Sequence, residues 1–307
     1  MKNSFVRQVL FPLAAAFIWG TAFVAQSICA RHLPPFAVNA LRSLIAVIVL
    51  LPVCRIFDGA KQRRGAARKT DFRRLAIGAL VCGVFLAFGT NLQQAGLADT
   101  SAGKAGFITA FYVVLVPVFG IFLRKPVGAR IWVSVVLVAV GLWLLCIKAG
   151  ERFVLERSDS FLILCAVFYA LQVLAVDRYA QEVDGIRLSI GQFLVAGIIS
   201  AILSVCFERT GWSLDGLRQC VLPLLYIGVM SSGVGYTLQI LSQQGGNATL
   251  VSLIFSLESV FSVLAGAVVL GDRLSGREYL GCGVLFAGVI LAQIPLESLR
   301  KRQKPLQ

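Results

Sequence analysis

Ten long apolar stretches follow one another along the chain, and each is long enough to cross a bilayer as a helix of about 20 residues. Hydrophobic residues make up 58% of the sequence and charged residues 14%, against about 25% charged in soluble domains. The sequence therefore predicts an all-α polytopic membrane protein and excludes the soluble and disordered classes. The ten predicted helices are Val9–Ala30, Phe36–Cys54, Leu75–Leu97, Ala105–Leu123, Ile131–Ile147, Ser160–Val176, Ile186–Phe207, Val221–Gln243, Ala248–Leu270 and Glu278–Leu296.

Two anchors recur at nearly the same offset and indicate a duplicated half. The pentapeptides Gly89–Gln93 and Gly235–Gln239 both read G-x-x-L-Q, and Gly141 and Gly288 occupy equivalent positions in matching apolar runs. We expect five-helix repeats at residues 1–147 and 160–296 and a basic tail at 297–307. An odd number of crossings inverts the second copy, so the prediction is two inverted repeats, which many secondary carriers share.

The basic residues sit mainly in connectors, which predicts orientation and makes a nucleic-acid partner unexpected despite the net charge of +14. Placing the N-terminus inside puts 19 Lys and Arg residues on the cytoplasmic side and 9 outside. The longest polar connector, Arg55–Arg74, is then cytoplasmic. We expect a multi-pass protein of the plasma membrane, a bacterial inner membrane, with both termini in the cytoplasm.

No motif in the chain points to a cofactor, a metal or catalysis. The eight cysteines are scattered through apolar segments without a C-x-x-C pair, and His32 is the single histidine. Phosphate-binding loops, H-E-x-x-H and G-x-S-x-G are absent from the sequence. We therefore expect no cofactor and no enzyme activity.

The residues resemble the drug/metabolite transporter superfamily, and within it the ten-helix EamA-type permeases. The resemblance rests on Ile18-Trp19-Gly20, Tyr112 to Pro117, Ser256 to Phe261, and Gly271-Asp272-Arg273-Leu274, and it covers about Val9 to Pro295. It implies secondary transport of small metabolites, often export, through a central cavity lined mainly by helices one, three, four, six, eight and nine. The family usually has proline where this chain has Ser259, so loss of a kink in helix nine is expected here.

Polar and aromatic side chains inside the spans are candidates for the substrate cavity. Aromatic rings can stack on a planar solute, and neutral amides can hydrogen-bond a polar or zwitterionic one. Simple packing or helix tying is the alternative for each residue. The candidates are Trp19, Thr90, Asn91, Gln93, Gln94, Tyr112, Tyr169, Gln172, Tyr236, Gln239 and Gln243.

Two charged side chains lie inside predicted spans. Glu258 is the one carboxylate well inside a helix, whereas Asp99, Asp177 and Asp272 lie near helix ends, where we expect water to reach them. Glu258 could bind and release a proton or contact the substrate, or it could be a structural carboxylate bonded to another helix. Arg42 could snorkel to the surface, pair structurally with another group, or face the cavity.

The sequence thus predicts a secondary transporter of small metabolites such as amino acids or drug-like compounds, with export as the expected direction. Proton coupling and facilitated transport both remain open. The alternatives are an intramembrane enzyme acting on lipid-linked substrates and a non-transporting receptor or scaffold. The expected partners are a small-molecule substrate, the lipid bilayer and protons, in a monomer or homodimer.

Overall fold

The computed structural model describes residues 5–63, 71–97, 102–125, 127–147, 156–208, 213–270 and 274–294. Within these ranges all regular elements are helical, which confirms the predicted all-α class. The elements are η1 (Val6–Leu10), α2 (Phe11–His32), α3 (Pro35–Arg63), α4 (Phe72–Gly96), α5 (Ala102–Ala110), α6 (Tyr112–Phe122), α7 (Ala129–Cys146), α8 (Arg157–Tyr179), α9 (Gly185–Phe207), α10 (Leu214–Leu225), η2 (Tyr226–Gly235), α11 (Tyr236–Gln243), α12 (Ala248–Phe255), α13 (Leu257–Leu270) and α14 (Gly276–Gln293).

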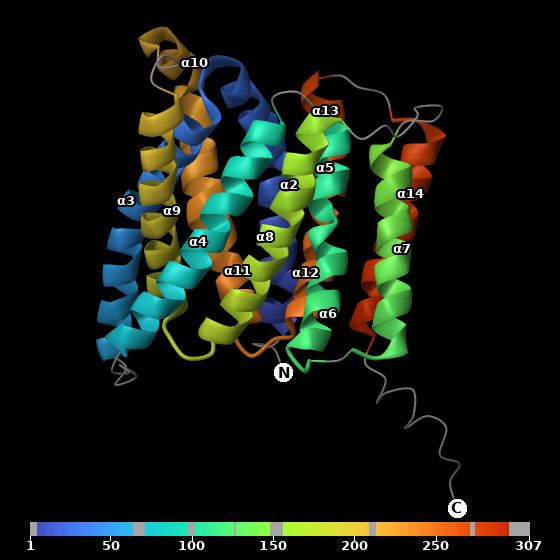
Figure 1. Cartoon of the computed structure of the whole chain (residues 1–307). Helices are drawn as coiled ribbons and strands as arrows, with labels where there is room; N and C mark the ends of the chain where they lie inside the picture. Colours follow the sequence, from blue (N-terminus) through green and yellow to red (C-terminus); the bar gives the residue numbers. More distant parts are fainter. Residues whose placement is uncertain are drawn as a thin grey trace, which may run out of the picture.

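The helices form one upright bundle in which successive spans alternate in direction, so that α2 and α8 run oppositely (Figure 1). In the described part of the chain, nine spans are long and apolar enough to cross a membrane by length and composition. The tenth, α14, carries Arg277, Glu278 and Gln293 near its ends but packs against α7. α2 and α8 open the two predicted halves, and inverted repeats would require the opposite directions that these two helices have (Figure 1).

Several helices extend beyond the apolar runs that predicted them. α3 continues past Cys54 to Arg63, and the eighth span begins at Leu214 instead of Val221. The tenth helix begins at Gly276 and ends at Gln293, not at Leu296. Polar caps set such ends: the Ser213 side chain accepts from the Gly216 amide at the start of α10.

The two halves pack on one another reciprocally. α2 contacts α13 as α8 contacts α6, and α3 contacts η2 as α4 contacts α9. The last helices of the two halves, α7 and α14, also pack together, and Gly141 and Gly288 lie at this contact, where there is no room for a side chain. A Cβ atom at Gly141 would stand 2.7 Å from Leu285, and one at Gly288 would stand 3.0 Å from Leu137. The second sequence anchor therefore marks the close approach of α7 and α14.

The fourth and ninth spans are each broken near the middle of the bundle. The fourth breaks at Phe111 between α5 and α6, and Pro117 lies inside α6. The ninth breaks at Ser256 between α12 and α13, where no proline is present. The expected loss of the kink in helix nine is therefore wrong. The Ser256 hydroxyl donates to the Leu253 carbonyl at 2.6 Å, a local bond of the kind that bends helices.

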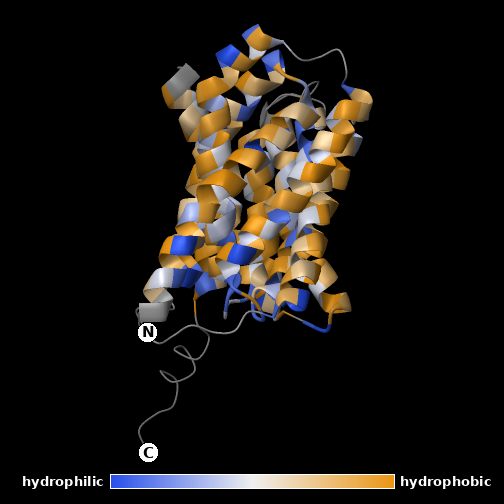
Figure 2. Cartoon of the chain, turned by 90° about the vertical axis from the view of Figure 1, so that its left-hand side faces the viewer, coloured by the Kyte–Doolittle hydropathy of each residue, from blue (hydrophilic) through white to orange (hydrophobic). Residues whose placement is uncertain are grey.

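Apolar side chains cover the sides of the bundle, and polar ones gather at its ends and along its interior (Figure 2). Phe122, Ile56 and Val205 are among the large apolar side chains that remain exposed. In contrast, the buried set includes many amides and hydroxyls as well as Arg42 and Glu258. This reversal of the usual soluble pattern suits a bundle that is surrounded by lipid and has a polar centre.

Candidate functional site: a polar cavity between the two halves

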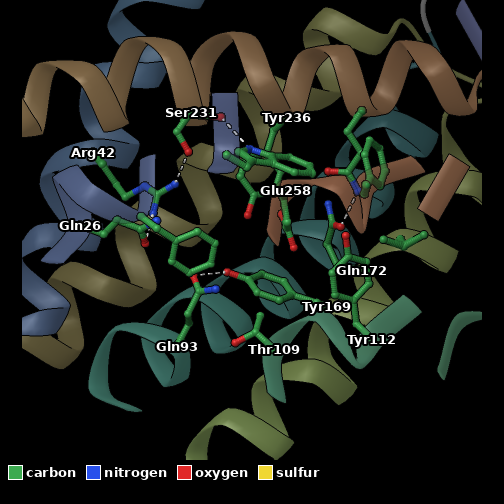
Figure 3. A pocket seen from close by; sticks show the side chains of 15 residues that line it. Gln26, Arg42, Gln93, Thr109, Tyr112, Tyr169, Gln172, Ser231, Tyr236 and Glu258 are labelled. Atoms are coloured by element: carbon green, nitrogen blue, oxygen red, sulfur yellow. Dashed lines mark hydrogen bonds between the residues drawn. The ribbon is translucent and has the colours of Figure 1, made fainter. Parts of the chain in front are cut away.

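A cavity lies at the centre of the bundle, where spans from both halves meet. Its wall is mainly aromatic and amide, with one cation and one carboxylate (Figure 3). The lining residues are Trp19, Phe23, Gln26, Arg42, Gln93, Thr109, Tyr112, Tyr169, Gln172, Val173, Ser231, Tyr236, Gln239, Phe255 and Glu258.

The structure brings together most of the residues that the sequence singled out. Seven of the eleven cavity candidates line this space, together with both intramembrane charges. The seven candidates come from five spans and the two charges from two more, although the candidates lie up to 220 positions apart in the chain (residues 19 to 239). The seven are Trp19, Gln93, Tyr112, Tyr169, Gln172, Tyr236 and Gln239.

The other four candidates, Thr90, Asn91, Gln94 and Gln243, are buried outside the lining set. The Thr90 hydroxyl donates to the Leu86 carbonyl of its own helix.

The amides among the four reach neighbouring helices. Asn91 Nδ2 donates to Ser200 Oγ at 2.8 Å, and Gln243 Nε2 donates to the Val173 carbonyl at 2.9 Å. Gln94 Nε2 reaches the Gln26 carbonyl at 3.4 Å. In a central helix all faces are buried, so polarity alone does not identify the face that meets the cavity.

Six lining residues were not among the candidates. Helical periodicity offered a signal for two of them, because Phe23 and Gln26 lie four and seven positions after Trp19 on one face of α2. Thr109 similarly lies one turn before Tyr112, across the break in the span. The six are Phe23, Gln26, Thr109, Val173, Ser231 and Phe255.

Arg42 does not snorkel to the surface, because its residue is only 3% exposed and lines the cavity. Its Nε donates to Ser232 Oγ at 2.8 Å, and one terminal nitrogen donates to Ser231 Oγ at 3.1 Å. The other terminal nitrogen reaches Gln26 Oε1 at 3.4 Å. The snorkelling interpretation is therefore wrong, since neutral acceptors on α2 and η2 hold the guanidinium inside the bundle.

The π-helix η2 explains how two consecutive serines reach one guanidinium. A π-helix has a wider turn than an α-helix, and such segments often occur at functional sites. Ser231 and Ser232 lie within this segment, and Trp19 Nε1 donates to the Ser231 carbonyl at 3.3 Å. The irregular backbone of η2 thus positions both a cation and an aromatic ring at the cavity.

Trp19 is the centre of an aromatic cluster on one wall. Its ring centroid lies 4.9 Å from that of Tyr236 and 5.1 Å from that of Phe255. Gly235 allows this approach, because a Cβ atom there would stand 2.7 Å from Trp19 Nε1. The equivalent Gly89 leaves the same space for Tyr169, whose ring would lie 2.8 Å from an added Cβ.

The repeated G-x-x-L-Q pentapeptide therefore has a structural reason in both halves. In each copy the glycine leaves space for an aromatic side chain from the first helix of the other half, and the glutamine lines the cavity. Tyr169 donates from its hydroxyl to Gln93 Oε1 at 3.0 Å, and Gln239 Nε2 donates to Gln172 Oε1 at 2.9 Å.

Further glutamine side chains form hydrogen bonds at the C-terminal ends of α8 and α11. Gln181 Nε2 donates to the Gln243 carbonyl at 2.7 Å, and Gln244 Nε2 donates to the Ala180 carbonyl at 2.9 Å. The Lys125 ammonium also binds the Asp177 carboxylate at this end. Because the Asp177 residue is only 6% exposed, the expectation that water surrounds it is wrong; Asp99 and Asp272 lie outside the described residues.

Glu258 lies in the first turn of α13, directly after the break in the span. The residue is 7% exposed, and its side chain borders the cavity. No ion pair to Glu258 occurs among the described residues. A carboxylate in this position can meet a solute or a proton in the cavity, and the helix N-terminus favours its negative charge.

Metal-ligating side chains do not gather in the described ranges, where no group of three or more His, Cys, Asp or Glu residues could hold an ion. The lining itself offers hydrogen bonds, aromatic contact and two opposite charges.

Comparison with known proteins adds a family match that covers most of the chain. A model of the EamA-like transporter family matches residues 7–147 and again residues 157–293. A solved crystal structure, 19% identical in sequence, has the same fold with a TM-score of 0.75 and covers 97% of this chain and 99% of its own.

Three curated relatives are informative. An uncharacterized transporter of Archaeoglobus fulgidus is 29% identical over 91% of this chain and 83% of its own length. A WAT1-related chloroplastic protein of Arabidopsis thaliana is 26% identical over 91% of this chain and 67% of its own length. The threonine/homoserine exporter RhtA of Salmonella typhimurium is 25% identical over 54% of this chain and 55% of its own length.

Proposed function

We propose, from the premise that this chain belongs to the EamA-like transporter family, that it is a secondary exporter of small metabolites such as amino acids or drug-like compounds. The observation that carries the proposal is the central cavity, because spans of both halves supply its polar wall within an apolar bundle. Charged and polar groups at membrane depth are costly, and those that face a cavity commonly mark a substrate pathway.

Alternating access is the mechanism that best fits this arrangement. The two halves pack reciprocally around the cavity, and each contributes a span that is broken at the level of the site. Rocking one half against the other would expose the cavity first to one side and then to the other. The glutamine bonds between α8 and α11 would have to open at one end during this cycle.

The proposed orientation places both termini in the cytoplasm of a bacterial inner membrane, because basic residues favour the cytoplasmic side. Export and proton coupling through Glu258 belong to the same proposal. A proton gradient can drive solute outward when one buried carboxylate binds a proton on one face and releases it on the other. The exporter function of the Salmonella relative supports the direction and an amino-acid cargo.

Counterflow in proteoliposomes tests the carrier function. Vesicles loaded with an unlabelled mixture of the twenty proteinogenic amino acids and homoserine are diluted into buffer with one labelled member at a time. A carrier accumulates at least one label transiently and saturably, and protein-free vesicles do not. If none accumulates, transport of amino acids is excluded, and the same assay with cationic drug-like compounds decides whether the carrier proposal as a whole fails.

A further inference from the structure

Two opposite charges border the cavity without neutralising each other. Arg42 and Glu258 are both buried, and within the described part of the chain neither forms an ion pair. Both side chains line the same cavity, so the two charges face one small space. A buried charge without a counter-charge is costly, and a bound molecule that carries the complementary charges would remove that cost.

The hydrogen bonds of Arg42 leave part of its guanidinium open. Five N–H groups are available in this side chain, and the three bonds described above use Nε and one N–H on each terminal nitrogen. One N–H on each terminal nitrogen remains. Two such groups form the fork that binds the two oxygens of a carboxylate.

The rest of the lining selects among anions. All acceptors that hold Arg42 are neutral, and Glu258 is on the same cavity, so a dianion such as a phosphate ester would meet one cation and one like charge. A monocarboxylate meets a single matching cation. An ammonium group on the same molecule meets Glu258 and the aromatic rings of Trp19 and Tyr236, which favour cations over their faces.

We infer that the substrate is a small zwitterion, an amino acid, whose carboxylate binds Arg42 and whose ammonium group lies toward Glu258. This inference rests on the proposed function and names the substrate class and the two recognition residues of that site. It makes Arg42 a specificity-determining residue instead of a mere link between α2, α3 and η2.

Binding to the purified, full-length protein provides the test. Thermal shift or calorimetry first identifies which of the twenty proteinogenic amino acids and homoserine binds best. That amino acid is then compared with its decarboxylated amine and its deaminated acid, in the wild type and in Arg42→Gln and Glu258→Gln. Arg178→Gln is the matched control, because the Arg178 side chain is 70% exposed and lies outside the cavity.

A crossed pattern is expected. Arg42→Gln should weaken the binding of the amino acid and of the deaminated acid by about tenfold or more, a typical loss for a hydrogen bond to a charged group. Binding of the amine should be unchanged. Glu258→Gln should weaken the binding of the amino acid and of the amine and leave the binding of the deaminated acid unchanged. Arg178→Gln should change none of the three. If Arg42→Gln fails to fold, Arg42→Lys serves, because it keeps the charge and loses the fork.

Several results would overturn the inference. They are the absence of binding by any amino acid, an equal loss for all three ligands in Arg42→Gln, and unchanged binding of the amino acid in that variant. An equal loss is what a purely structural role of Arg42 produces. Amino-acid binding with the crossed pattern but without counterflow would keep the recognition site and reject the carrier function. Counterflow of a solute that lacks a carboxylate, without amino-acid binding, would keep the carrier function and reject the recognition site.

Discussion

Gly20 of α2 lies so close to Glu258 of α13 that a Cβ atom at position 20 would stand 2.5 Å from the Glu258 carbonyl oxygen. The same Cβ would meet Phe261 at 2.5 Å and the Ser262 amide at 2.8 Å. Backbone atoms cannot move aside cheaply at such distances. The position of Glu258 at the cavity therefore depends on the absence of a side chain at residue 20.

Gly20→Ala should lower the stability of the protein by about 1–3 kcal/mol, the usual cost of overpacking. Thermal unfolding in detergent would show this as a reduced Tm. Gly283→Ala is the matched control, because Gly283 is also helical and a Cβ there would meet nothing within 4 Å. Equal Tm values for the two variants would contradict the close packing of α2 on α13.

Gln239→Leu should abolish or redirect transport and leave the protein folded. The change removes the donor to Gln172 Oε1 and an amide from the cavity wall, and one unpaired buried acceptor costs about 1–3 kcal/mol. Counterflow and size-exclusion chromatography measure the two effects. Gln293→Leu is a suitable control, because Gln293 lies at the end of α14 outside the lining set. Wild-type kinetics in Gln239→Leu would place the site elsewhere.

Glu258→Gln should lose pH-driven accumulation and retain exchange at saturating substrate. The amide cannot carry a proton between the two faces, whereas exchange of substrate for substrate needs no net proton movement. Uptake driven by an imposed pH gradient is compared with counterflow at equal internal and external pH. Continued accumulation against the substrate gradient in this variant would exclude proton coupling at Glu258.

Lys125→Gln should destabilise the protein more than Asp177→Asn does. The Asp177 side chain is 7% exposed and that of Lys125 is 52% exposed. Losing the lysine leaves a buried carboxylate without its cation, but losing the carboxylate leaves an ammonium that water can reach. Unfolding of both single variants and the double variant gives the coupling energy, and the reverse order would contradict the asymmetric burial.

Arg64→Cys, in a protein whose eight native cysteines are replaced, should react with a membrane-impermeant thiol reagent only from the cytoplasmic side. Residue 64 lies outside the described residues, so this prediction follows from the charge distribution alone. Arg218→Cys should react only from the opposite side, and the Arg218 side chain is 81% exposed. External labelling at position 64 would overturn the orientation.

Helix content and number followed from the sequence because each apolar run must satisfy its own backbone in a membrane, and only a helix does this within a single segment. The repeat was visible for a related reason. Gly89 and Gly235 each admit an aromatic ring from a neighbouring helix, and Gly141 and Gly288 each admit a facing helix. Such contacts leave no room for a side chain, so glycine recurs at the equivalent positions of the two halves of the sequence.

Which polar side chains meet the cavity was decided by tertiary structure. Gln93 and Gln94 are neighbours in sequence and equally polar, yet Gln93 lines the cavity and Gln94 reaches the Gln26 carbonyl. Arg42 could have reached the surface by length alone, but Ser231 and Ser232 on a π-helical turn hold it inside. Sequence determines which groups are polar and how they repeat along a helix; the packing of other helices around that helix decides which face remains open.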